Sequence, residues 1–224
     1  MWRATADEMG TIVSPWRNDA EACRPLQSPG LRQRANLCYA SRKFRMARPG
    51  GDWEAQMKSG RWAKGYTQAE LDEAQEKFGL VFPPDLMALL RDRRPLDGHD
   101  WTDEVAIMRM LDWPLEGLLF DVEHNVLWWP EWGEKPDSPD ARKEVLRSVV
   151  SHAPKLIPLI AHRYLPEEPH EEGNPVFSVY QSDVIYYGAN LTDYFEREFT
   201  GGDYRPRLDQ MKHIRFWSDL VERA

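Results

Sequence analysis

Apolar residues recur at helical spacing from Thr67 onward, and the residues that flank them predict where each helix begins and ends. Thr67 stands three residues before Glu70, which is the spacing of a capping box at a helix start. Apolar positions then repeat at helical intervals as far as Phe78, and Gly79 is typical of the position that follows a helix. The pattern therefore predicts a first helix between Thr67 and Gly79.

Proline marks the start of two further helices. Pro84, in "VFPPD", suits the first turn of a second helix, and Pro95 is expected to end it. In "SPDARKEVLRSVVSHAP", Ser138 is the expected cap of a third helix and Pro139 lies in its first turn. Both segments place leucines and valines on one face, as helices that cover a core do.

After Pro154 the pattern changes to that of strands. The segments "KLIPLIAH", "PVFSVYQ" and "DVIYYG" are short, rich in β-branched and aromatic residues, and bounded by turn residues. "NLTDYFEREF" then predicts a helix capped by Asn190. A last helix is predicted from Leu208 to Glu222, and it should bury Met211, Ile214, Trp217 and Leu220. Because helices come first, strands cluster centrally and helices close the chain, the sequence indicates an α+β fold.

Residues 1–65 show no sustained helical or strand period and are rich in Arg, Gly, Pro and Ser. They carry twelve Lys/Arg and six Asp/Glu, a net charge of +6. Two interpretations are a low-order basic extension and a misassigned leader, with Met46 or Met57 as the true start. The functional alternative is a basic tail that grips a partner. We therefore place a boundary between residues 1–65 and 66–224.

The charge of residues 66–224 limits the partners of this domain. Seventeen Lys/Arg and thirty-one Asp/Glu give it a net charge of −14, within a chain total of −8. An acidic domain is a poor nucleic-acid binder, because phosphate attraction needs an excess of basic residues. It suits a basic protein partner, since opposite potentials speed encounter.

Composition also predicts the compartment. No apolar run approaches the length of a membrane span, and "MWRATADEMG" lacks the features of a secretory signal. The two cysteines, Cys23 and Cys38, form neither a disulfide framework nor a zinc motif. We therefore expect a cytoplasmic protein that does not bind a membrane.

The stretch "HRYLPEEPHEEGNP" is the first candidate for chemistry. Its histidines, His162 and His170, are eight residues apart with prolines between them, so no helix can place both on one face. The composition instead predicts an exposed acidic loop containing Glu167, Glu168, Glu171 and Glu172. His162 ends an apolar strand, and we expect it to bond neighbouring backbone. No metal site is predicted here.

Nothing in the sequence favours an enzyme. It has no GxSxG motif, no phosphate loop and no dinucleotide fingerprint, and neither cysteine lies in a patterned segment. We predict no catalytic residue and no cofactor. The segment "HNVLWWPEWGEKP" leaves two interpretations open for Trp128, Trp129 and Trp132: rings that close a core, or an exposed binding surface.

Four blocks of the sequence resemble the SUKH superfamily, which includes fungal Smi/Knr-type regulators of cell-wall synthesis and many bacterial proteins. The first block, "FGLVFPPDLMALL", is similar to the junction between the first two helices of that family. The others are "WPLEGLLFDVEHNVLWWPEWGEKP", "APKLIPLIAHRYLPEEP" and "GNPVFSVYQSDVIYYGANLTDYFEREF". The resemblance covers about residues 66–199, and we expect the SUKH-like domain to extend to the C-terminus, over residues 66–224. Where many members have a Gly-Gly or Asn-Gly turn after the second helix, this chain has "RDRRPLDGHD".

The resemblance implies helices packed against a central, mostly antiparallel sheet, and no active site. Many bacterial members are immunity proteins that bind and neutralise a toxin, often a nuclease, whereas the fungal relatives are interaction and regulatory proteins. The leading hypothesis is thus a non-catalytic immunity protein that occludes a basic toxin. The expected contact residues are Glu131, Trp132, Glu134, Glu167, Glu168, Glu171 and Glu172. We interpret Arg163, Tyr164, Asp183 and Tyr186 as internal polar ties between strands.

Two alternatives stay open. The first is a regulator or scaffold with an endogenous partner, which predicts an isolated gene, whereas immunity predicts a toxin gene immediately upstream. The second is an unrecognised hydrolase that pairs an Asp or Glu with His124 or His162. It predicts a concave pocket in which one of these histidines meets a carboxylate.

Overall fold

The structure is a computed structural model, which describes residues 61–200 and 211–223. The basic extension predicted before residue 66, including Cys23 and Cys38, falls almost entirely outside these residues. The first two helices of the described part are α3 (Gln68–Phe78) and α4 (Pro84–Asp92). The long helix α5 (Glu104–His124) and α6 (Pro139–Ser151) follow, and α7 (Leu191–Thr200) and α8 (Trp217–Arg223) come after the main sheet.

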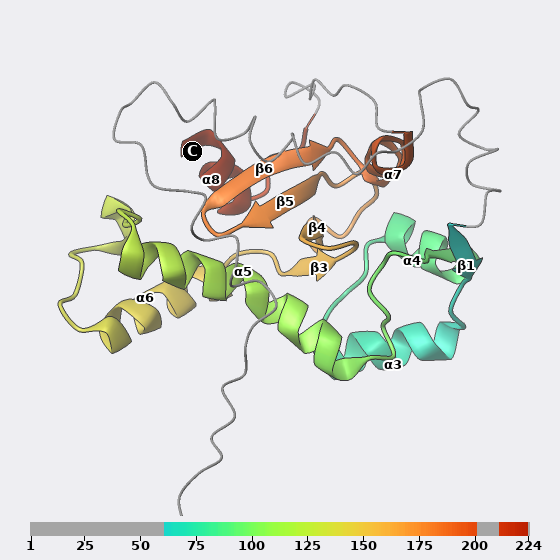
Figure 1. Ribbon diagram of the computed structural model, residues 1–224, viewed down its shortest axis with the longest axis horizontal. Helices are drawn as coiled ribbons and strands as arrows, with labels where there is room; N and C mark the ends of the chain where they lie inside the picture. Colours follow the sequence, from blue (N-terminus) through green and yellow to red (C-terminus); the bar gives the residue numbers. More distant parts are fainter. Residues whose placement is uncertain (1–60, 201–210, 224) are drawn as a thin grey trace, which may run out of the picture. The chain divides into compact units, whose positions relative to one another are not determined.

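The main sheet has four strands in sequence order, each antiparallel to the next (Figure 1). These are β3 (Leu156–Pro158), β4 (Arg163–Pro166), β5 (Val176–Tyr180) and β6 (Asp183–Gly188). A second antiparallel pair joins β1 (Trp62–Lys64) to β2 (Arg93–Pro95). The prediction of an α+β fold with antiparallel strands is confirmed. The strands β1, β2 and β4 were not predicted, and β1 lies before residue 66.

The predicted helix starts are formed as the local sequence indicates. The Thr67 hydroxyl accepts the Glu70 N–H at 3.3 Å, and the Glu70 carboxylate accepts the Thr67 N–H at 2.7 Å. Gly79 ends this helix at φ 60°, a left-handed conformation that glycine adopts without steric cost. The Ser138 hydroxyl accepts the Ala141 N–H at 3.4 Å and caps α6. Each cap satisfies a backbone donor that the helix leaves unpaired.

Helix α5 was not predicted, because Pro114 lies inside it and proline usually ends a helix. Tertiary contacts stabilise it. A Cβ on Gly117 would lie 2.9 Å from the Gln181 Cα, so only glycine lets α5 come this close to the β5–β6 turn. The buried carboxylate of Asp121 accepts the Ser182 N–H at 2.7 Å and also the Ser182 hydroxyl. The turn and the helix therefore fix each other.

The last helix is shorter than predicted. Leu208 lies outside the described residues, residues 211–216 are not helical, and α8 begins at Trp217. Phe216 has φ 68°, and its N–H donates to the Asp219 carboxylate at 3.0 Å. This reversal of the chain prevents an earlier helix start. Ile214, Trp217 and Leu220 are buried as expected, whereas Met211 is only half-buried.

Two clusters of buried side chains hold the elements together. The first lies among α3, α4, α7 and one part of the main sheet, and it includes Leu71, Leu86 and Phe195. The second lies among α5, α6, α8 and the rest of the sheet, and it includes Leu118, Leu146 and Trp217. Helices α7 and α8 contact β6, and α5 contacts β3 and β5. None of the helices described, α5 included, is both long and apolar enough to cross a bilayer.

Candidate functional site

The acidic loop, residues 167–174, joins β4 to β5 and is a loop as predicted. It is organised around Asn174, whose side chain is fully buried. The Asn174 amide donates to the carbonyls of Pro166 and Pro169, at 3.1 and 2.8 Å. The Gly173 N–H donates to the Asp85 carboxylate of α4 at 2.9 Å. These bonds give the loop a fixed conformation.

Two of the predicted contact residues in this loop form internal ion pairs. The Glu168 carboxylate lies 2.7 Å from Arg215, and the Glu171 carboxylate lies 2.7 Å from Lys212. Lys212 also donates to the backbone carbonyl of Glu172 at 2.5 Å. The cations come from the segment just before α8, about forty residues further along the chain. Part of the negative charge of the loop is therefore neutralised within the protein.

The other two glutamates of the loop differ in their surroundings. The Glu167 carboxylate accepts the Val81 N–H at 3.3 Å, so it connects the loop to the segment before α4. Glu172 lines a pocket, and its carboxylate has no hydrogen bond or ion pair within the described residues. Of the four glutamates predicted here, Glu172 is thus the one that lines the pocket without an internal partner among the described residues.

This pocket has a volume of about 740 Å³ and lies between β1, α4, α7 and the end of the acidic loop. Its apolar lining comes from Trp62, Leu89, Leu191, Phe195 and Phe199. Its charged lining comes from Asp85, Asp92, Glu172, Glu196 and Arg93. Arg93 lies 3.0 Å from the Asp92 carboxylate, so the two largely neutralise each other. A lining that combines apolar side chains with excess negative charge favours a ligand that is both apolar and cationic.

The tryptophan segment lies between α5 and α6 and includes the short 3₁₀ helix η1 (Pro130–Trp132). The ring of Trp132 is half-buried, 4.9 Å from the Trp129 ring and 5.5 Å from the Trp128 ring between centroids. All three rings pack against the second core cluster. The Trp128 indole donates to the Gly133 carbonyl at 2.8 Å. These rings therefore serve as a packed edge of the core.

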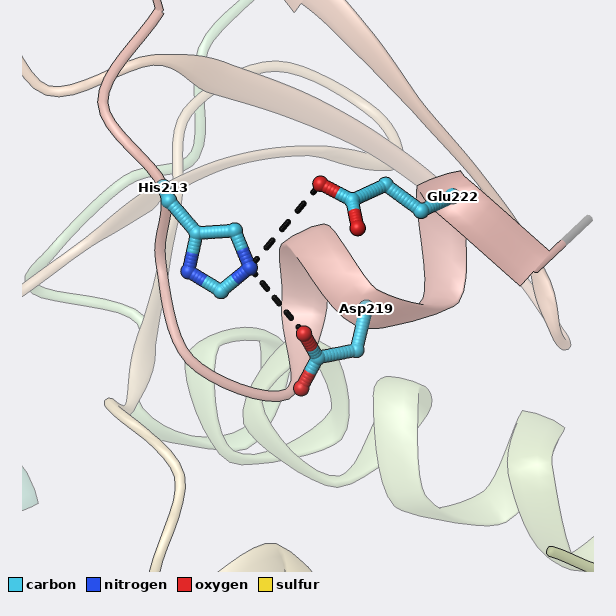
Figure 2. Close-up of side chains that lie close together, drawn as sticks. All are labelled: His213, Asp219 and Glu222. Carbon is cyan, nitrogen blue, oxygen red and sulfur yellow. Dashed lines mark hydrogen bonds and ion pairs between the residues drawn. The ribbon is translucent and has the colours of Figure 1, made fainter.

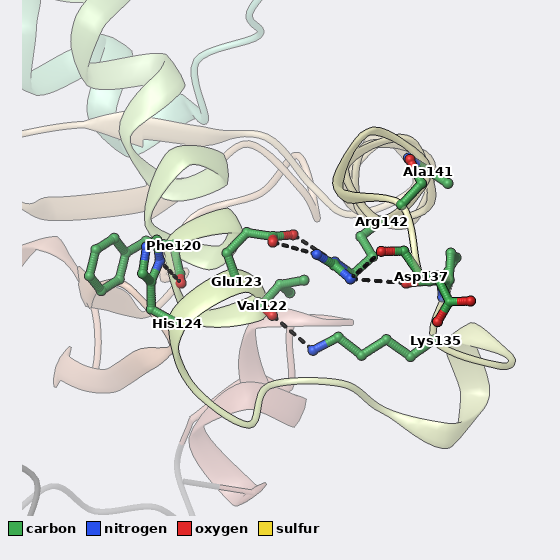
Figure 3. A network of polar contacts seen from close by, with 10 residues as sticks. Phe120, Val122, Glu123, His124, Lys135, Asp137, Ala141 and Arg142 are labelled. Atoms are coloured by element: carbon green, nitrogen blue, oxygen red, sulfur yellow. Dashed lines mark hydrogen bonds and ion pairs between the residues drawn. The ribbon is translucent and has the colours of Figure 1, made fainter.

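Polar contacts anchor the tryptophan segment to α5 and α6 (Figure 3). Arg142 of α6 makes two hydrogen bonds to the Glu123 carboxylate of α5, at 2.6 and 2.7 Å. Lys135 donates to the Val122 carbonyl at 2.8 Å, as Figure 3 also shows. A paired guanidinium and carboxylate give a directional link, so the segment keeps one position between the two helices.

The two predicted contact glutamates of this segment are not equivalent. Glu131 pairs with Arg223 of α8, with oxygen–nitrogen distances of 2.8 and 3.1 Å. The hydrogen bond from Arg223 lowers the pKa of Glu131 below its usual value. Glu134 is exposed. The structure thus places the tryptophan segment and the acidic loop in contact with the same C-terminal segment, residues 211–223.

The histidines proposed for a hydrolase lie in unlike environments. His162 is half-buried in the turn between β3 and β4, and its backbone carbonyl accepts the Val179 N–H at 3.0 Å. Burial, with a smaller effect of the Arg163 charge, lowers the pKa of His162 to about 4. His124 is exposed at the end of α5, where its ring stacks on Phe120 and its Nδ1 lies 3.0 Å from the Phe120 carbonyl.

The polar ties predicted between strands are formed in part. Arg163 donates to the Ser178 hydroxyl at 2.7 Å and ties β4 to β5. The Tyr164 hydroxyl donates to the Met110 carbonyl at 2.9 Å, which ties the sheet to α5. Tyr186 donates to the Ser218 hydroxyl at 2.6 Å and so ties the sheet to α8, while Asp183 is exposed at the start of β6.

Sequence reasoning did not find the pocket. Its lining comes from four separate segments, and no local pattern shows that Trp62, α4, Glu172 and α7 meet. Comparison of the chain with protein-family models, with curated proteins and with solved structures gives no match. Function is therefore argued from the geometry of the described residues.

Proposed function

We propose that this chain is a non-catalytic protein-binding module of the SUKH type, and that it acts as an immunity protein against a basic toxin. The observation that supports this proposal is the pocket beside the acidic loop. Its lining combines apolar side chains with four carboxylates and one guanidinium. A partner segment that carries an aromatic or aliphatic side chain next to Lys or Arg would fit both properties, because such residues are common interface anchors.

Electrostatics supports a basic protein partner. Residues 66–224 carry a net charge of −14, which attracts a basic protein over distances of about 10 Å at moderate salt. A nuclease is basic where it holds its substrate, so an acidic protein can occupy that surface. The mechanism is steric and electrostatic occlusion, and no covalent bond is made or broken.

The hydrolase alternative receives less support from the two histidines. A general base is most effective when its pKa is near the working pH. The pKa of about 4 makes His162 a weak base at neutral pH, and His124 bonds a carbonyl of its own helix. A regulator or scaffold with an endogenous partner would use the same pocket, and the partner alone distinguishes it from an immunity protein.

The test uses the full chain and the purified product of the gene immediately upstream. Immunity predicts a one-to-one complex by calorimetry, a dissociation constant that rises steeply with salt, and stoichiometric loss of the toxin's activity. Absence of a complex with that product contradicts immunity. A complex that leaves the activity intact favours the regulatory alternative.

A pair of charge reversals locates the interface. Glu172→Lys combined with Glu196→Lys should weaken the complex about tenfold or more, or roughly 1.4 kcal/mol or more. Glu144→Lys combined with Glu76→Lys, at exposed positions of α6 and α3 outside the pocket, is the matched control with the same change of net charge and should change the affinity little. Equal effects in the two chains would show that net charge alone, and not the pocket, attracts the partner.

A further inference from the structure

Three side chains that can bind a metal ion meet at the C-terminal segment (Figure 2). His213 lies on the chain just before α8, and Asp219 and Glu222 project from one face of α8 because they are three residues apart. The His213 Nε2 is 3.0 Å from Asp219 Oδ1 and 3.9 Å from Glu222 Oε1. All three ligand atoms lie within 4.8 Å of one another.

We propose that His213, Asp219 and Glu222 bind one divalent transition-metal ion of the Zn²⁺ type. Ligand atoms at ~2.0–2.2 Å from such an ion lie about 3.0–3.5 Å from each other in tetrahedral or octahedral geometry. The His213–Asp219 distance already falls in this range, whereas the Glu222 carboxylate is 3.9 Å from the His213 Nε2 and within 4.8 Å of the Asp219 oxygen, so this exposed side chain must move closer to both. Water completes the coordination, because the three side chains are accessible to solvent.

The set of ligands decides the class of ion. Imidazole nitrogen is a ligand that Zn²⁺, Mn²⁺, Fe²⁺ and Ni²⁺ accept, whereas Ca²⁺ and Mg²⁺ are bound by oxygen atoms. One imidazole with two carboxylates therefore favours a transition metal over the alkaline-earth ions. An ion at this place would also separate the imidazole from the two carboxylates, so it replaces the hydrogen bond that joins His213 to Asp219.

The surrounding backbone holds two of the ligands in place. The second oxygen of Asp219 accepts the Phe216 N–H at 3.0 Å, which leaves Oδ1 directed at His213. The Ser218 hydroxyl accepts the Ile214 N–H at 2.8 Å, one residue after His213. The bond to the second oxygen of Asp219 is of the kind that fixes the direction of a ligand and raises metal affinity, whereas the Ser218 bond positions the backbone next to His213.

The neighbouring Trp217 fixes the start of α8. Its side chain is buried, and its indole donates to the Pro154 carbonyl at 2.7 Å. The two halves of the site are therefore attached to the core on both sides of the turn at Phe216. An ion bound there would cross-link α8 to the chain that supplies Lys212 and Arg215 to the acidic loop. Metal binding should thus raise the thermal stability of the protein.

The experiment titrates Zn²⁺ into the full chain, freed of any tag and treated with a chelator, by calorimetry. Cys23 and Cys38 are replaced by serine in every variant, because thiolates also bind Zn²⁺. The proposal predicts one saturable ion per chain and a higher Tm with Zn²⁺. His213→Gln should lower the affinity about tenfold or more, and Glu222→Gln should lower it by a smaller factor.

His170→Gln is the matched control, since His170 is an exposed histidine among glutamates in the acidic loop. It should leave both the Zn²⁺ affinity and the Zn²⁺-dependent rise in Tm unchanged. All three substituted side chains are exposed, so circular dichroism should show the same fold in every variant. The absence of saturable binding in the parent chain would overturn the proposal. Equal affinity in His213→Gln and the parent would overturn it as well.

Discussion

The acidic loop and the pocket beside it are both rich in carboxylates, but the protein uses these groups differently in the two places. In the loop, Glu168 and Glu171 are paired with Arg215 and Lys212. At the pocket, Glu172 has no such partner among the described residues, and apolar side chains share the lining with it. The density of acidic residues in a sequence therefore does not report which carboxylates are paired in the fold. The proposal of a cationic partner rests on the carboxylate of Glu172, which lies beside apolar surface.

The largest expected effect comes from breaking the fixed conformation of the loop. Asn174→Ala would leave the carbonyls of Pro166 and Pro169 without their donor in a buried place. We expect a loss of about 2–4 kcal/mol in the free energy of unfolding, because each unpaired buried group costs about 1–3 kcal/mol. Urea unfolding measures it. Gln68→Ala removes an exposed side-chain amide and serves as control. A loss below about 1 kcal/mol for Asn174→Ala would show that the loop is not held in this way.

An effect of about 2 kcal/mol on the free energy of unfolding is expected from His162, which is half-buried in the turn between β3 and β4. Its pKa of about 4 in the folded protein lies below the usual 6.5, so the unfolded chain binds the extra proton first as the pH falls. Stability from neutral His162 is therefore present above pH 6.5 and lost between pH 6.5 and 4.

Replacement of His162 by glutamine should remove that part of the pH dependence. The free energies of unfolding of the parent and of His162→Gln are compared at neutral pH and near pH 4, the pKa of His162 in the folded protein. The variant should lose less stability than the parent as the pH falls. If the free energy of unfolding falls by the same amount in the two proteins, His162 titrates alike in the folded and unfolded states.

The smallest effect is expected from the ion pairs of the loop. Glu168 and Arg215 are 2.7 Å apart, but both side chains are about half exposed. Exposed pairs contribute only about 0.2–1 kcal/mol, because solvent screens them. A double-mutant cycle with Glu168→Gln and Arg215→Gln should give a coupling energy in that range. A coupling well above it would make the loop–C-terminal contact a main source of stability, contrary to this interpretation.

Local signals allowed much of the fold to be predicted. The caps at Thr67 and Ser138 and the stop at Gly79 act within a few residues, so they are visible in the sequence. Helix α5 could not be predicted, since Pro114 opposes it locally and its contacts with Gln181 and Ser182 are distant in sequence. Helix α8 starts late because the Asp219 side chain, which lies within the helix, accepts a hydrogen bond from the Phe216 N–H in the turn before it.

The candidate sites were predicted less well than the fold. The acidic loop was placed correctly as a loop, but its partners Lys212 and Arg215 follow it by about forty residues. The pocket joins four segments, and no periodicity reports that they meet. The cluster at His213 was missed because a helix was predicted through it, and helical spacing would direct His213 away from Asp219.

Whether the pocket is the partner-binding surface is tested by measuring the binding of two variants to the upstream gene product, each with a different pair of neutralised glutamates. Glu172→Gln with Glu196→Gln removes two charges from the pocket, and Glu168→Gln with Glu171→Gln removes two from the paired part of the loop. Net charge changes equally in both chains. We predict that the pocket pair weakens binding about tenfold, whereas the loop pair changes it by less than about threefold. Equal losses, or a larger loss from the loop pair, would contradict the assignment of the pocket as the partner-binding surface.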